Sequence, residues 1–312
     1  MARGWRLSVM VAAAGLCMVA LPLLAPASSD DETRPDGKGT GTLLNPGNGN
    51  KDAGQAKGAK PGGGGTSNGI NYHGGPVMLG TVNVYYIWYG NWSGNSATSI
   101  LADLADSIGG SPYFHINTTY YDGGANHVSG LVQNRMSAND NYSLGTTLSD
   151  ANIQTIVANA IGRGALPYDS NGAYFVLTSQ DVAESSGFCT KYCGWHTYGT
   201  ISGTNIKYAF VGNADRCPTA CEAQTTSPNG NAGADAMASV IAHELEEMVT
   251  DPNLNAWYDT RGYENADKCA WTFGTVSTAS NGSLYNMTLG ARQYLIQRNW
   301  VNASGGYCAL SY

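Results

Sequence analysis

The sequence predicts an α/β or α+β domain, in which a sheet with flanking helices is followed by a long functional helix and an irregular, disulfide-tied C-terminal region. Three observations lead to this fold class. Runs of β-branched and aromatic residues alternate with amphipathic segments up to about residue 212. A long helical pattern then covers residues 234–250. Beyond that pattern, short apolar runs lie among turn residues and the last cysteines.

Residues 1–27 have the pattern of a secretory signal peptide. Arg3 and Arg6 give a positively charged start, residues 7–24 are largely apolar, and small residues at 25–27 form a cleavage site. The alternative, a transmembrane anchor, is less favoured because the run is short for a bilayer span and lacks a basic stop-transfer cluster. We therefore expect a secreted, extracellular protein that has no membrane partner once the signal is removed.

Residues 28–71 are rich in Gly, Pro, Lys and Asn, and we predict a disordered linker because they hold too few large apolar residues to offset their ordering entropy. Residues 72–312 follow as one domain of about 240 residues, which is long enough for a substantial core. The whole chain has a net charge of −7 with 12% charged residues. This weakly acidic composition offers no basic patch, so nucleic acid is excluded as a partner.

The first half of the domain alternates between strands and helices. Residues 80–90 are a β-branched and aromatic run bounded by glycines, which is typical of a buried strand. Residues 96–108 have apolar side chains at helical spacing and end at two glycines. The same criteria predict a helix at 148–161 and strands at 128–134, 173–178, 206–212 and, near the C-terminus, 293–297.

Six cysteines remain when Cys17 is removed with the signal: Cys189, Cys193, Cys217, Cys221, Cys269 and Cys308. An even number in an exported chain predicts three disulfides. Six cysteines allow 15 pairings. The simplest assignment joins the pairs that are close in sequence, Cys189/Cys193 and Cys217/Cys221, and leaves Cys269 with Cys308. A zinc site built from four of these residues is the less favoured alternative in an oxidising compartment.

The helix predicted at residues 234–250 is the most informative stretch, because it contains the string His243-Glu244-Leu-Glu-Glu247. Residues four apart on a helix lie on one face, so His243 and Glu247 can share a metal ion while Glu244 projects beside them. In zincin metalloproteases, His-Glu-x-x-His supplies two zinc ligands and a glutamate that acts as general base. Here Glu247 replaces the second histidine, which favours harder ions such as Mn or Ca and still allows Zn. Pro252 should end the helix.

A third ligand is expected from residues 262–269, a short distance downstream. Glu264 as a ligand and Asp267 as the residue that orients a helix histidine would match the gluzincin arrangement, and the two roles can also be exchanged. His196 is a further candidate, either as a ligand or as an acid and base, unless it only packs under a disulfide loop. His-Glu-x-x-Glu also occurs by chance on solvated helix faces. The exported setting, the apolar neighbours of His243 and the acidic pair downstream favour the metal site.

Five ordered motifs occupy much of the domain: HGGPVMLG at 73–80, VYYIWYGNW at 84–92, GFCTKYCGWH at 187–196, YAFVGN at 208–213 and CPTAC at 217–221. They resemble the phosphate-induced protein family, also called Exordium, and the resemblance covers essentially the whole domain after the linker. It implies an extracellular or cell-wall-associated protein, linked in plants to growth and to phosphate or brassinosteroid responses. It implies no defined biochemical activity.

Two functional hypotheses follow. The first is a secreted, zinc-dependent, zincin-like metallopeptidase that acts on an extracellular polypeptide, with His243, Glu247 and Glu264 as metal ligands, Glu244 as general base and Asp267 in support. The second is a non-catalytic extracellular protein of the Exordium type, which binds a cell-wall polymer or acts in growth signalling and holds any metal structurally. The 19 Tyr and 7 Trp residues of the chain suit contact with carbohydrate.

Overall fold

The computed structural model describes residues 1–2 and 69–312. Most of the predicted signal peptide at 1–27 and of the predicted linker at 28–71 therefore lies outside the described residues. Within the part of the chain that is described, no helix is both long and apolar enough to cross a bilayer.

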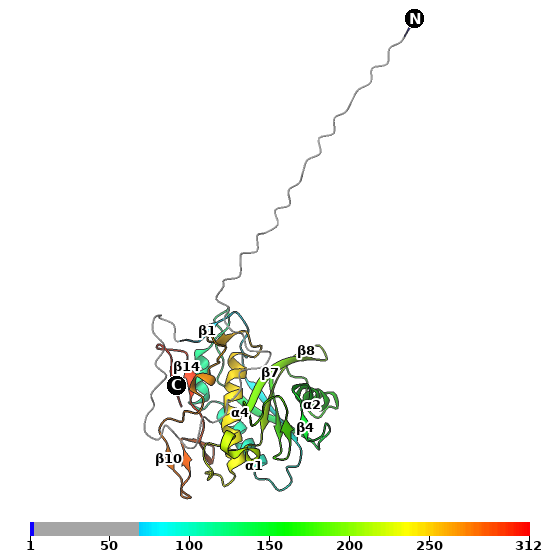
Figure 1. Cartoon of the computed structure of the whole chain (residues 1–312). Coiled ribbons are helices and arrows are strands. Elements are labelled where there is room, and N and C mark those ends of the chain that lie inside the picture. The colour runs from blue at the N-terminus through cyan, green and yellow to red at the C-terminus, as the bar shows by residue number, and fades with distance from the viewer. Residues whose placement is uncertain (3–68) are drawn as a thin grey trace. The chain divides into compact units, whose positions relative to one another are not determined.

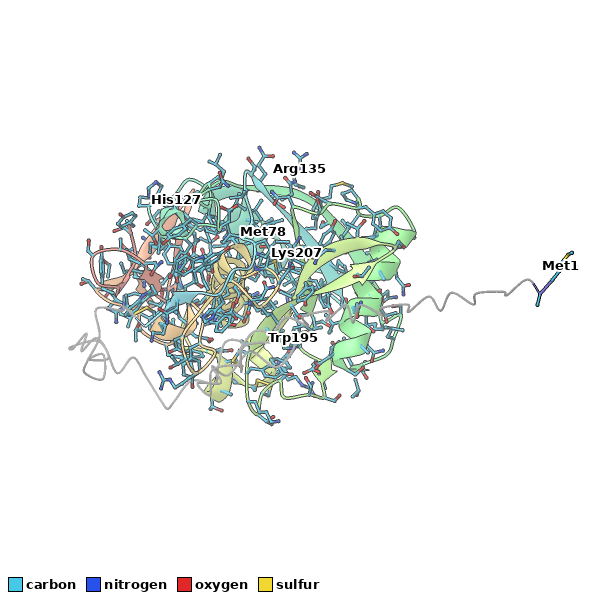
Figure 2. All side chains as sticks on the ribbon, turned by 90° about the horizontal axis from the view of Figure 1, so that it is seen from above. Met1, Met78, His127, Arg135, Trp195 and Lys207 are labelled. Carbon is cyan, nitrogen blue, oxygen red and sulfur yellow. A yellow bond between two sulfur atoms is a disulfide. The ribbon has the colours of Figure 1, made fainter. Side chains whose placement is uncertain are left out.

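A five-stranded sheet forms the centre of the first half, with the strand order β3-β2-β5-β8-β7. Its strands are β2 (Val82–Tyr89), β3 (Val132–Asp140), β5 (Gly172–Thr178), β7 (Gly194–Ile201) and β8 (Thr204–Gly212). β3, β2, β5 and β8 are mutually parallel, whereas β7 runs antiparallel to β8 at one edge. Figure 2 shows Arg135 of β3 and Trp195 of β7 at opposite edges of this sheet. The mixed sheet with few helices confirms the predicted α/β or α+β class.

The predicted strands at 80–90, 173–178 and 206–212 are confirmed as β2, β5 and β8 within two residues at each end. The strand predicted at 128–134 begins later, at Val132, and continues to Asp140. The strand β7 was missed, because residues 194–201 contain two glycines and two threonines and lack the apolar run that marks a buried strand. That omission matters, since β7 carries His196.

Three helices follow the predicted pattern: α1 (Ala97–Ile108), α2 (Asp150–Gly162) and α4 (Ala232–Thr250). α1 buries the apolar residues that define its helical spacing. α2 begins at a capping box, in which the Ser149 hydroxyl accepts from the backbone N–H of Asn152 and the Asn152 side chain accepts in return. α4 begins at Asn231, whose side chain accepts from Ala234, and ends at Thr250, two residues before Pro252.

α4 lies between the main sheet and the C-terminal part of the domain (Figure 1). All its residues except Ala232 and Ala236 are buried. The helix has no solvated face on which its glutamates could lie, since the sheet covers one side and the C-terminal segments cover the other. Glu244, Glu246 and Glu247 are each 0% exposed.

The C-terminal region consists of short pairs and turns, as predicted. Its hairpins are β10 (Ser277–Thr278) with β11 (Leu284–Tyr285), β12 (Met287–Leu289) with β13 (Arg292–Tyr294), and β14 (Asn299–Val301) with β15 (Tyr307–Ala309). The strand predicted at 293–297 therefore corresponds only to β13. The remaining short elements are β1 (Asn71–Tyr72), η1 (Phe114–Thr119), β4 (Thr147–Leu148), β6 (Ala183–Glu184), η2 (Ala214–Arg216), α3 (Pro218–Cys221), β9 (Trp257–Tyr258) and η3 (Asp267–Cys269).

Three disulfides are present, and one of the predicted pairings, Cys269–Cys308, is confirmed. The other two predicted pairings were wrong, because the bridges are Cys189–Cys217 and Cys193–Cys221. The physical reason is the helical turn α3, which directs Cys217 and Cys221 to one side, where each meets a cysteine of the segment before β7. Each bridge closes a loop with a sequence separation of 28, for which chain entropy gives roughly 3 kcal/mol of stabilisation.

Candidate metal centre

The C-terminal half of α4 brings His243 and Glu247 together on one face, as their spacing predicts. His243 Nε2 lies 3.0 Å from Glu247 Oε1, and both side chains are 0% exposed. His243 Nε2 has no hydrogen-bond partner, so this short approach lacks the alignment of a hydrogen bond. Two donor atoms that face a common point without bonding each other are the arrangement that a shared cation requires.

The segment after α4 returns to the same face of the helix and adds Asp267. Asp267 Oδ1 lies 3.5 Å from His243 Nε2. The backbone N–H of Asp267 donates to Glu247 Oε1 at 3.0 Å, and the N–H of Glu264 donates to Asp267 Oδ2 at 3.2 Å. Asp267 thus faces the same imidazole nitrogen as Glu247 rather than the opposite ring nitrogen. This position suits a direct ligand, which is the exchanged role that the sequence left open.

Glu264 approaches a different histidine, His196 of β7. His196 Nε2 lies 3.2 Å from Glu264 Oε1 and 3.1 Å from Glu264 Oε2, and 3.7 Å from Glu247 Oε2. His196 is 0% exposed and packs against the cluster from the edge of the sheet. Of the alternatives considered for His196, the structure therefore places it among the candidate ligands.

Glu244 lies in the same cluster, beside β7. The donor atoms of His196, Glu244 and Glu247 lie within 4.8 Å of one another, as do those of His243, Glu247 and Asp267. β7 can approach α4 this closely because residue 194 is a glycine. A Cβ there would lie 2.6 Å from Val240 Cγ1 and 3.3 Å from Glu244 Oε1.

Burial and repulsion between the carboxylates shift the pKa values of the residues in the cluster. Burial raises the pKa of Glu247 well above its usual value, and the charge of Asp267 raises it further. Burial likewise raises the pKa of Glu264, with Asp251 as the next cause. Burial is the largest single influence on His243 and opposes its protonation, but Glu247, Asp267 and Glu244 together outweigh it, and the pKa of His243 is raised well above its usual value. The cluster thus concentrates more negative charge than its histidines can balance.

The donor set fits a divalent cation. Imidazole nitrogens and carboxylate oxygens are ligands for Zn and Mn, and the carboxylates alone also suit Ca. His243 Nε2, Glu247 Oε2 and Asp267 Oδ1 are buried and have no hydrogen-bond partner. A buried polar atom without a partner is costly, and a cation bound at the cluster would satisfy all three. The four residues predicted as ligands are therefore brought together, and His196 joins them.

The cluster is closed in this conformation. A pocket borders the first half of α4 and is lined by Ser239, Val240, Trp271 and Gln297 among others. None of the cluster residues lines that pocket. The donor side chains of the cluster are 0–1% exposed. A ligand larger than an ion reaches them only if the covering segments move.

Glu246 is a buried carboxylate that the sequence analysis did not single out. It is 0% exposed, and burial raises its pKa well above the usual value. It lies on the side of α4 toward η1, where Tyr113 and Asn117 contact it. The position of Glu246 between His243 and Glu247 in the sequence did not predict its burial. Only the packing of η1 on α4 shows that Glu246 lies on a different face of the helix from the two candidate ligands.

Comparison with known proteins places this chain in a family. Residues 70–309 match the family model described as "Phosphate-induced protein 1 conserved region". Protein EXORDIUM-like 3 of Arabidopsis thaliana is 33% identical over 279 residues, which cover 77% of this chain and 82% of the relative. Protein EXORDIUM-like 5 of the same plant is also 33% identical, over 74% of this chain and 75% of its own length.

A third relative extends the match to another plant. Protein PHOSPHATE-INDUCED 1 of Nicotiana tabacum is 26% identical over 61% of this chain and 67% of its own length. No solved structure matches, so a relationship of α4 to the zincin helix stays a prediction. The match over nearly all of the described domain shows that this chain belongs to the phosphate-induced protein, or Exordium, family.

Proposed function

We propose that this chain is a secreted, metal-dependent hydrolase whose metal centre is built on α4. One observation carries the proposal: two histidines and four carboxylates from α4, β7 and the segment 264–267 converge in a buried cluster. Buried charges of one sign are retained in a fold only when something compensates them. Divalent cations compensate such clusters in hydrolases, with Zn as the first candidate here and Mn or Ca as the others.

In peptide hydrolysis, each residue of the cluster would have a distinct role. His243, Glu247, Glu264 and Asp267 would hold the metal, which would supply Lewis-acid stabilisation for the carbonyl oxygen of the substrate. Glu244 takes one proton from a water molecule as the water oxygen bonds to the carbonyl carbon. The bond from that carbon to the amide nitrogen then breaks, and Glu244 passes the proton to the leaving nitrogen. The substrate class is an extracellular polypeptide.

Export is part of the proposal. Three disulfides support an oxidising compartment. The signal-like residues 1–27 give the route. Protein collected from the medium of an expressing culture should begin near Ser28, as measured by mass spectrometry of its N-terminal peptide. A chain retained in the cell with its first residues intact would contradict export.

The matched pair Glu244→Gln and Glu246→Gln tests catalysis. Both residues are 0% exposed on α4, and both changes replace a carboxylate with an amide, but only Glu244 lies in the cluster. We expect Glu244→Gln to keep its metal and to lose peptide hydrolysis by about 10²–10⁴-fold, whereas Glu246→Gln should cleave like the wild type. The measurement is mass spectrometry of products from a peptide library. Equal cleavage by Glu244→Gln and the wild type would show that Glu244 is not the base.

The closure of the cluster favours a second candidate function. In this alternative the metal is structural, and the protein binds a cell-wall polymer or acts in growth signalling without catalysis. Structural metal sites are closed, whereas catalytic sites keep an open position. Retention of the metal-loaded protein on a wall polysaccharide, together with no cleavage of any library peptide, would favour this alternative. No retention on a panel of glycans would count against it.

A further inference from the structure

We propose that the cluster holds two divalent cations rather than one, with Glu247 as the bridging ligand. This inference rests on the metal centre of the proposed function and deepens it. It also gives His196, which the predicted ligand set did not include, a defined role. The first site, site A, consists of His243, Glu247 and Asp267. The second, site B, consists of His196, Glu247 and Glu264, with Glu244 beside it.

The donor atoms already form two groups. One group contains His243 and Asp267, the other contains His196 and Glu244, and each is compact to within 4.8 Å. Glu247 is the residue that they share. A single tetrahedral site would instead draw its ligands into one group around one point. Two groups with one common carboxylate are the arrangement of a bridged pair of ions.

The two oxygens of Glu247 face different histidines. Glu247 Oε1 lies 3.0 Å from His243 Nε2, whereas Glu247 Oε2 lies 3.7 Å from His196 Nε2. A carboxylate that binds one ion on each oxygen needs this division. Glu247 Oε2 is buried and has no hydrogen-bond partner, so it is available for the second ion.

Each histidine also has a second carboxylate of its own. Asp267 Oδ1 lies 3.5 Å from His243 Nε2. His196 Nε2 is hydrogen-bonded to both oxygens of Glu264, at 3.2 and 3.1 Å, and an ion at site B would replace the proton between them. Each half of the cluster therefore offers one imidazole, one unshared carboxylate and one oxygen of Glu247. A site for a single ion does not need two such sets of ligands, whereas a pair of ions does.

The charge of the cluster agrees with two ions. Glu244, Glu247, Glu264 and Asp267 carry four negative charges when ionised, and the histidines are neutral when they bind metal. Two divalent cations supply four positive charges and close the balance, whereas one would leave two negative charges uncompensated. These side chains are 0–1% exposed, so water cannot screen the excess.

Metal stoichiometry tests the inference. Wild-type protein is loaded with Zn, desalted and measured by elemental analysis beside His196→Ala, His243→Ala and the control Glu246→Gln. We expect two equivalents per chain in the wild type and the control, and one in each histidine variant. One equivalent in the wild type would overturn the bridged pair and leave the proposed function intact. No bound metal in the wild type would overturn both.

Loading with Mn gives a measurement that does not depend on whether the variants fold. Two Mn ions bridged by a carboxylate couple magnetically, whereas one isolated ion gives the ordinary six-line paramagnetic resonance spectrum. We expect a coupled spectrum in the wild type with two equivalents of Mn. In whichever histidine variant stays folded, the six-line spectrum should appear. An uncoupled six-line spectrum from the fully loaded wild type would contradict a bridged pair.

Discussion

The main sheet and the interior around the C-terminal half of α4 are equally buried and chemically opposite. All seven residues of β5 are buried, and its central residues Tyr174, Phe175, Val176 and Leu177 are 0% exposed. Around the C-terminal half of α4, by contrast, two histidines and four glutamates are 0–1% exposed beside apolar residues such as Met248 and Val249. Burial of an apolar side chain contributes about 1.5–3 kcal/mol, whereas burial of an ion costs several kcal/mol unless it is compensated. The sheet therefore stabilises the fold by itself, whereas the cluster costs free energy unless a bound cation compensates its charges.

The largest expected effect comes from the apolar region. Phe175→Ala should lower the free energy of unfolding by about 3–5 kcal/mol, because a fully buried ring in β5 leaves a cavity. The loss should be the same before and after chelation, because β5 contributes no residue to the cluster. Urea denaturation in the presence and absence of a chelator measures it. A loss that disappears on chelation would mean that the two regions are not separate.

Metal removal tests the second region. A cation held by the folded protein alone adds about 2.7 kcal/mol to stability at a free concentration of 100 times its dissociation constant. We expect chelation to lower the unfolding free energy of the wild type by about that amount for each bound ion, and to lower that of His243→Ala, which keeps one of the two ions, by about half as much. Thermal denaturation with and without a chelator measures both. If chelation leaves the stability of the wild type unchanged, the cluster does not need a bound cation, and it then does not differ from the sheet in this respect.

Gly194→Ala tests the contact between β7 of the main sheet and α4. The added methyl group would lie 2.6 Å from Val240 Cγ1, so β7 and α4 must separate, at a cost of about 1–3 kcal/mol. Because His196 lies two residues further along β7, site B should lose metal before site A. Gly162→Ala is the matched control, since a Cβ at Gly162 meets nothing within 4 Å. Unchanged metal content in a destabilised Gly194→Ala protein would show that the site tolerates this separation.

Glu222 shows what a buried carboxyl does outside the cluster, and its effect is the smallest. Burial, followed by the charge of Asp215, raises the pKa of Glu222 to about 7. The folded state then holds its proton more tightly than the unfolded state, whose pKa is about 4.3. Stability from this group is therefore complete below about pH 4 and is lost as the pH rises to about 7. Glu222→Gln should flatten the decline of melting temperature over that range, and an unchanged slope would contradict the shift.

Local patterns were enough for most of the fold. α1, α2 and α4 have helical spacing and ordinary start and stop residues, β2 is an apolar run between glycines, and β5 is an apolar run that begins at a glycine. Such signals lie within a few residues of each other, so one sequence suffices. The edge strand β7 has no such local signal and could not be predicted in this way. Its residues pair with β8 through the backbone, and its side chains carry no strand pattern.

The candidate site divides in the same way. His243, Glu244 and Glu247 follow from helical spacing, and Glu264 and Asp267 from their closeness in sequence. His196 is 68 residues from Glu264, and only the sheet brings them together. The two disulfide predictions failed for the same reason. The cysteines at 189 and 193 pair with those at 217 and 221, rather than each pair closing within its own segment. Contacts between distant segments are what a single sequence does not encode locally.

The bridges Cys189–Cys217 and Cys193–Cys221 also set an order for maturation. Cys193 lies three residues before His196, so oxidation anchors the edge of the sheet on which that histidine is presented. Without these bridges β7 keeps its pairing with β8 and its packing on α4 but loses this covalent anchor. If the cluster binds metal as proposed, its assembly would follow the oxidation of these four cysteines.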